Sequence, residues 1–198
     1  MLGLRVPLVT QDVMKKLTGF TLIELLVVVV VVGIGFALAV PSFQGMLARN
    51  RLATEANELL LAINLARSEA SRAGQIISLQ AVNAVDGNEF GGGYCVVLGD
   101  PGNCNGPVIR SFVDFSGDIT LTGVDDTANG GGWGAPRDSI QFSGLGAMSG
   151  TANQLRNLDL CLQGQRGQRI QIALIGRAKS WREAEAGDPA PPAVQPGC

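Results

Sequence analysis

One acidic residue, Glu24, lies inside a strongly apolar stretch near the start of the chain. Residues 19–36 read GFTLIELLVVVVVVGIGF, and Glu24 is their only ionisable side chain. As an α-helix, Phe20–Val40 would span about 32 Å at about 1.5 Å per residue, and the hydrocarbon core of a bilayer is about 30 Å thick. Basic residues dominate the preceding segment, which predicts a cytoplasmic N-terminus and export of the rest; the charges there are Arg5, Asp12, Lys15 and Lys16.

An ionisable group in a membrane span is costly and usually has a partner. Cleavage between Gly19 and Phe20 would create an ammonium group on Phe20, four residues from Glu24 and so on the same helix face. In a bundle of such helices, Glu24 could pair with this amine of its own or of a neighbouring chain. Two alternatives are a secretory signal peptide cut after Ala37-Leu38-Ala39 and a plain signal anchor. The apolar stretch is longer than the roughly 7–15 residues typical of a signal peptide.

The four cysteines are the other residues with chemical potential: Cys95, Cys104, Cys161 and Cys198. They form no C-x-x-C pair, and the chain has no histidine to complete a zinc site. Disulfides in an oxidising compartment fit better, and reduced, buried thiols are the alternative. Of the three possible pairings we favour Cys95–Cys104 with Cys161–Cys198, which close the shorter loops and contribute about 2.5 and about 4 kcal/mol by loop entropy.

The absence of histidine also disfavours an enzyme, because the commonest general base is missing. No Ser/His/Asp or Cys/His set can exist, and no pair of acids is marked by its spacing. Gly130–Gly134 lacks the Lys-Ser/Thr of a phosphate-binding loop. We therefore predict no catalytic residues, no cofactor and no metal, and an exported enzyme is the remote alternative.

The pattern from Thr21 to Ala73 predicts one long helix. Pro41 would remove a backbone hydrogen bond and bend it, and Gly74 would end it. Beyond Pro41 the helix is amphipathic, with an apolar stripe made of Leu52, Ala56, Leu59, Ile63, Ala66 and Ala70.

The segment from Gly74 onward is rich in glycine and predicts short antiparallel strands. These strands and the helix stripe packed on them indicate an α+β fold. The predicted strands are Ile76–Val82, Tyr94–Leu98, Val108–Phe115, Ile119–Thr122, Ser139–Phe142, Leu158–Gln163 and Arg169–Ile175. Two longer insertions are Asp86–Gly93 and Asp125–Pro136. The tail Glu183–Cys198 is rich in proline and alanine and would be extended unless Cys198 holds it.

The stretch Lys15-Lys16-Leu17-Thr18-Gly19-Phe20-Thr21-Leu22-Ile23-Glu24 resembles the class III signal of type IV pilins and pseudopilins. The resemblance implies cleavage after Gly19 by prepilin peptidase, N-methylation of Phe20 and burial of the helix in a filament core. It also implies that Glu24 pairs with the Phe20 amine of a neighbouring subunit. Gly33 and Pro41 fall where pilin helices carry a glycine and a helix-bending proline. The leader is longer than many, and Met14 is an alternative start.

Ala66-Arg67-Ser68-Glu69-Ala70 resembles the ARSEA signature of the FimT/FimU/GspH group of minor pilins, and the C-terminal pattern agrees. That pattern comprises Leu158–Leu162, Gln168–Ile172 and Gly176-Arg177. The resemblance implies a pilin-like fold with two sheets packed on the helix. It implies a leader at 1–19, a transmembrane and filament-core helix at 20–41, an amphipathic helix at 42–73, a β-rich domain at 74–182 and a tail at 183–198.

The resemblance further implies a low-copy subunit of a type IV pilus tip or priming complex that supports pilus assembly. The alternative is a pseudopilus tip subunit in type II secretion; two cysteine pairs and the proline-rich tail favour the pilus. Implied partners are major and minor pilins or pseudopilins, prepilin peptidase and the inner-membrane assembly platform. The implied location is the bacterial inner membrane, with a periplasmic domain, and then the filament.

A last alternative is DNA binding during natural transformation. Gly176-Arg177-Ala178-Lys179 resembles the G-R-x-R element of some FimT relatives, with Lys179 in place of the second arginine. Lysine keeps the charge but loses the planar fork. No acid lies between Asp159 and Glu183, so the segment is locally basic, although acids outnumber bases by twelve to eight from Gly74 onward. The competing interpretation is a solvated strand edge protected by lysine and arginine.

Overall fold

The structure is a computed structural model that describes residues 19–115, 118–124, 138–149, 156–182 and 198. The chain divides into two compact units, residues 1–43 and 44–198, and helix α1 (Leu22–Ala73) begins in the first and ends in the second. The helix starts where expected, because the Thr21 hydroxyl caps it by accepting a hydrogen bond from the Glu24 N–H at 3.2 Å. It ends at Gly74, whose φ of 64° suits glycine.

The helix continues through Pro41, as predicted. A bend at Pro41 stays a prediction.

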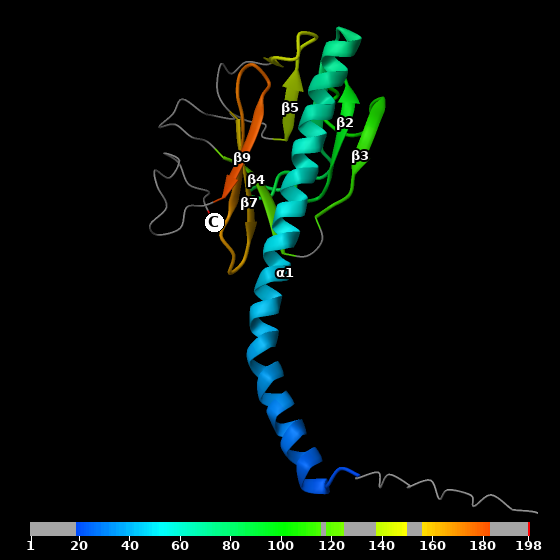
Figure 1. Cartoon of the computed structure of the whole chain (residues 1–198). Helices are drawn as coiled ribbons and strands as arrows, with labels where there is room; N and C mark the ends of the chain where they lie inside the picture. Colours follow the sequence, from blue (N-terminus) through cyan, green and yellow to red (C-terminus); the bar gives the residue numbers. More distant parts are fainter. Residues whose placement is uncertain (1–18, 116–117, 125–137, 150–155, 183–197) are drawn as a thin grey trace, which may run out of the picture. The chain divides into compact units, whose positions relative to one another are not determined.

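The described strands form two antiparallel sheets, as the family resemblance implied (Figure 1). One sheet has the order β3-β2-β1-β5-β6 and the other the order β4-β7-β8-β9. The strands are β1 (Ile77–Ala81), β2 (Tyr94–Leu98), β3 (Val108–Phe112), β4 (Ile119–Val124), β5 (Ser139–Phe142), β6 (Met148–Ser149), β7 (Arg156–Leu162), β8 (Gln168–Ile172) and β9 (Ala178–Arg182).

All seven predicted strands are present, with ends that differ by up to three residues. The predicted strand to Ile175 stops at Ile172, because the chain turns: the Gly176 N–H donates to the Ala173 carbonyl at 2.7 Å. Strand β6 was not predicted, since two residues carry no periodic signal. Strand β9 is also absent from the predicted set, because AKSWR has little apolar alternation.

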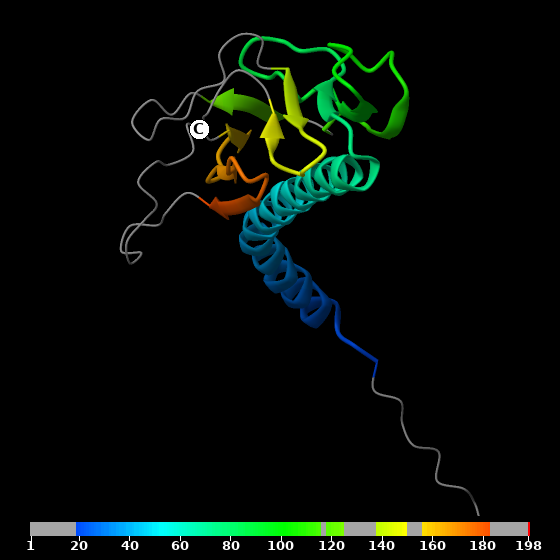
Figure 2. The same ribbon diagram turned by 90° about the horizontal axis from the view of Figure 1, so that it is seen from above.

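The hydrophobic core lies between the C-terminal half of α1 and the inner faces of both sheets (Figure 2). Every residue of the predicted helix stripe is buried. The stripe is rich in alanine, which lets the sheets approach the helix closely. The β1 side chains Ile77 and Leu79 and the β7 side chains Leu158 and Leu160 belong to the same core. The prediction that the stripe packs on a sheet is confirmed, and it packs on two.

Both disulfides have the pairing that the sequence favoured. Cys95 is bonded to Cys104, with the Cα atoms 5.9 Å apart, and Cys161 to Cys198, at 5.5 Å. The first closes a loop whose Asp100 accepts a hydrogen bond from Gln80 at 2.6 Å. The tail between Arg182 and Cys198, and the insertion at 125–136, lie outside the described residues.

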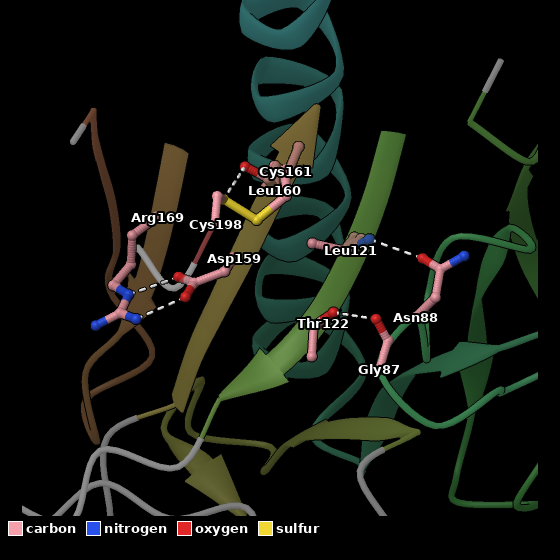
Figure 3. Close-up of a disulfide and its surroundings, with 9 residues drawn as sticks. All are labelled: Gly87, Asn88, Leu121, Thr122, Asp159, Leu160, Cys161, Arg169 and Cys198. Atoms are coloured by element: carbon pink, nitrogen blue, oxygen red, sulfur yellow. Dashed lines mark hydrogen bonds and ion pairs between the residues drawn. A yellow bond between two sulfur atoms is a disulfide. The ribbon is translucent and has the colours of Figure 1, made fainter. Parts of the chain in front are cut away.

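The insertion at Asp86–Gly93 joins the two sheets. The Leu121 N–H of β4 donates to the side chain of Asn88 at 2.8 Å (Figure 3). The Gly123 N–H of β4 donates to the side chain of Glu89 at 3.0 Å. The Phe90 N–H donates to the Leu121 carbonyl at 3.1 Å. The loop therefore forms hydrogen bonds, largely through its side chains, with backbone groups on the outer edge of β4. These bonds connect β4 to β1 and β2, the strands that precede and follow the loop.

Candidate functional site

The N-terminal part of α1 is the first candidate site. All of its large apolar side chains from Phe20 to Val40 are exposed. The helix is long and apolar enough to cross a membrane, by length and composition only. Apolar surface of this extent is unfavourable in water. It requires either hydrocarbon or other apolar helices around it.

Glu24 lies in the first turn of this exposed helix. Its side chain is exposed, and its backbone N–H is bonded to the Thr21 cap. A carboxylate here also complements the positive end of the helix dipole. The position therefore has a local role in starting the helix, and the pairing of Glu24 with a Phe20 amine stays a prediction.

The second candidate site is the basic segment around β9, an edge strand of its sheet. Arg177 lies in the turn between β8 and β9, and Lys179 is the second residue of β9. Both side chains are exposed, as is that of Arg182. Lys179 is opposite Gln171, and Trp181 is opposite Arg169. The cations thus follow one sheet edge.

Arg169 does not belong to this basic surface, although it lies in the locally basic segment. It is 1% exposed, and its Nε and Nη2 atoms both donate to the Asp159 carboxylate at 2.6 Å (Figure 3). Asp159 is 2% exposed and lies directly opposite on β7. A buried, bidentate pair of this kind is a structural element. The net charge available to a ligand is therefore smaller than the sequence suggested.

Two sequence motifs that looked independent meet in space. Arg67, of the ARSEA stretch, donates from Nε to the Gly146 carbonyl at 3.0 Å. A Cβ atom on Gly176 would collide with that same carbonyl and would lie 3.0 Å from the Arg67 Nε. The helix, the β5–β6 turn and the β8–β9 turn therefore meet at Arg67. No local sequence signal links residues so far apart, and sequence reasoning missed this contact.

The fold and the exposed N-terminal helix define a pilin-like protein, and comparisons with known proteins agree. A sequence model of the family described as "Type II transport protein GspH" matches residues 55–176, and one of the prokaryotic N-terminal methylation motif matches residues 14–40. The first match covers more than half of the chain. The chain belongs to the GspH family, within the type IV minor pilins and type II pseudopilins.

Solved structures of the type IV minor pilin FimU of Pseudomonas aeruginosa share this fold. In one crystal form the identity is 25% and the TM-score 0.52, covering 66% of this chain and 88% of that chain. A second form gives 23% and 0.50, covering 66% and 92%. The pilin-like fold predicted from the sequence is thus confirmed.

The chain is also similar to the type IV major fimbrial protein FimA of Dichelobacter nodosus. The identity is 38% over 80 residues, which are 38% of this chain and 51% of that protein. The chain therefore spans about half the length of this curated relative. Membership in a pilin family makes the chain a structural subunit and not an enzyme, as the sequence predicted.

Proposed function

We propose that this chain is a minor pilin that joins the tip or priming complex of a type IV pilus and supports pilus assembly. One observation carries the proposal: α1 has an unburied apolar half that matches a methylation motif, and the apolar stripe of its other half packs in the core of a GspH-type domain. An exposed apolar helix of this length would be unfavourable in a protein surrounded only by water. It fits a subunit held first in the inner membrane and then in a bundle of similar helices.

The mechanism follows from the chemistry of the first residues. Prepilin peptidase cuts after Gly19, and the new Phe20 amine is methylated. When the helix leaves the lipid for the filament core, Glu24 needs a cation in a medium of low dielectric constant. The Phe20 amine of a neighbouring subunit supplies it and sets the axial register of the two helices. The partners are other pilins and the inner-membrane assembly platform.

Mass spectrometry of the mature chain, purified from a cell with the native machinery, tests processing. An N-methylated Phe20 at the N-terminus is expected. A mature chain that begins at Val40 would instead support the alternative of a secretory signal peptide that is cleaved after Ala39. In that case the membrane-to-filament mechanism would be wrong.

The alternative destination is a type II secretion pseudopilus, which the family's description favours. The likeness to FimU and to FimA favours the pilus. Deletion of the gene separates the two: we expect loss of surface pili, with the levels of exported proteins unchanged. Normal piliation together with retained exoproteins in the periplasm would assign the chain to secretion.

DNA binding is a second candidate function, favoured by the exposed cations Arg177, Lys179 and Arg182 along the β9 edge. A mobility-shift assay with the detergent-solubilised full chain tests it. Binding at low salt should weaken steeply as salt rises, and both Arg177→Ala and Lys179→Ala should reduce it. Arg110→Ala, which removes an exposed cation from the other sheet, is the matched control. Absence of binding at low salt would exclude this function.

A further inference from the structure

Two turns interlock at the end of the domain where α1 finishes (Figures 1 and 2). They are the β5–β6 turn, at Gly144–Ala147, and the β8–β9 turn, at Ala173–Arg177. The Met148 N–H donates to the Leu174 carbonyl at 2.9 Å, and Gly146 and Gly176 are in direct contact. Both glycines have positive φ, and Arg67 of the helix is bonded to one of them. The two turns are therefore fixed relative to each other and to the helix.

These fixed turns expose large apolar side chains. Leu145 is 91% exposed, Ile175 65% and Leu174 43%. Turn residues are usually small or polar, because they face water. Leu145 and Ile175 each directly precede one of the two glycines in contact, so their side chains start from adjoining backbone. We call Leu145, Leu174 and Ile175 the apolar tip. Large apolar side chains exposed close together on a fixed backbone are typical of an interaction site.

A cation lies beside the apolar tip. Arg177 follows Gly176 directly, and its side chain is exposed. Its guanidinium makes no hydrogen bond or ion pair with any residue in the described part of the chain. Arginine is enriched in protein interfaces and among the residues that contribute most to their binding energy. The matching surface would combine an apolar pocket with a carboxylate.

We propose that the apolar tip docks into the globular domain of another pilin-type subunit, in an apolar pocket whose rim carries a carboxylate for Arg177. This inference rests on the proposed function, because it requires assembly with other subunits. A folded protein surface can bury two branched side chains and pair one cation together. Nucleic acid would pair with Arg177 and the other cations of the β9 edge but offers little to a leucine and an isoleucine at turn tips.

Photo-crosslinking in cells with the native machinery tests the partner. A photoreactive amino acid replaces Leu145 or Ile175 in the otherwise unchanged full chain, and Val113, which directly follows β3 and is 82% exposed, is the control position. We expect positions 145 and 175, but not position 113, to crosslink to a second protein that carries the N-methylated N-terminus of a mature pilin. No adduct at either position, or an adduct to lipid or DNA, would overturn the proposal.

Substitutions measure the contribution of the tip. The double variant Leu145→Ser/Ile175→Ser should reduce recovery of the chain in sheared filaments about tenfold or more, given the apolar area removed. Arg177→Glu should reduce it as well, and Val113→Ser should not. Recovery of both tip variants at the wild-type level would overturn the proposal while leaving the assembly role intact. A wild-type chain absent from filaments would instead contradict the proposed function, and the adducts above would still decide on the partner.

Discussion

Glu24 is a single acid whose role depends on what surrounds it. Within this chain it lies in the first turn of α1, beside the Thr21 cap and the positive end of the helix dipole. The cap does not require a carboxylate, because the Thr21 hydroxyl accepts the hydrogen bond from the backbone N–H of Glu24, and the dipole interaction of an exposed acid is worth only about 0.3–1 kcal/mol. A role confined to starting the helix therefore tolerates loss of the carboxylate, whereas the proposed role in assembly requires it.

Glu24→Ala is expected to leave membrane insertion intact and to reduce incorporation into filaments severely. In the proposed pairing, the Phe20 amine of a neighbouring subunit would then lose its partner in an apolar environment. Fractionation into membrane and sheared filaments measures both effects. Glu69→Ala is the matched control, because within the described residues the Glu69 carboxylate pairs with the exposed Arg72 three residues away. Normal incorporation of Glu24→Ala would contradict the pairing.

The buried pair of Asp159 and Arg169 shows how the environment of a residue overrides its type. Arg169→Ala should destabilise the domain by about 3–5 kcal/mol, because it leaves a buried carboxylate without its cation. Thermal unfolding of the detergent-solubilised chain, followed by circular dichroism, measures the loss. Arg182→Ala removes an exposed arginine from the neighbouring strand and should change stability by less than about 0.5 kcal/mol. Equal effects of the two variants would refute a structural role for the pair.

At the scale of elements, the two sheets and the helix are joined by a few contacts outside the core. Loop Asp86–Gly93 ties β4 to the other sheet, and Arg67 ties the helix to the β5–β6 turn. Neither contact involves residues close in sequence. A glycine at such a junction can be required because a Cβ atom would collide with a neighbour, or because the backbone has a positive φ. Substitutions can separate these two requirements.

Gly176→Ala and Gly164→Ala form such a comparison. Both glycines have nearly the same positive φ, 77° and 75°, so each alanine costs about 1 kcal/mol of backbone strain. The Cβ of Ala at 164 meets open space, whereas at 176 it collides with the Gly146 carbonyl and approaches Arg67. Gly176→Ala should therefore lower the unfolding temperature distinctly more. Equal shifts in the unfolding temperature would show that the turns do not interlock.

At the scale of the molecule, the surfaces of the two compact units suit different surroundings. The large apolar side chains from Phe20 to Val40 are exposed and unfavourable in water, whereas the described residues from Gln44 onward form a domain with its own core and two disulfides. The disulfides restrain different lengths of chain, at sequence separations of 9 and 37. Their contributions to the stability of the domain should differ accordingly.

Replacing both cysteines of a pair by serine tests this difference. By loop entropy, loss of Cys161–Cys198 should cost about 4 kcal/mol and loss of Cys95–Cys104 about 2.5 kcal/mol. Denaturant unfolding of the two double variants in detergent gives the order directly. A larger loss for the Cys95–Cys104 variant would show that local strain or packing, and not chain entropy, governs these bonds.

The sequence alone determined the long helix, its buried stripe, seven of the nine strands among the described residues and the preferred cysteine pairing. Each is encoded by local periodicity, by turn residues or by the separation between cysteines, and the resemblance to pilins added the two-sheet fold. Only the tertiary structure showed that Arg169 is neutralised by Asp159, that Asn88 and Glu89 complete the edge of β4, and that Arg67 meets Gly146 and Gly176. These contacts join residues from separate elements. Their partners are chosen by how the sheets pack on the helix, and no pattern along the chain records that choice.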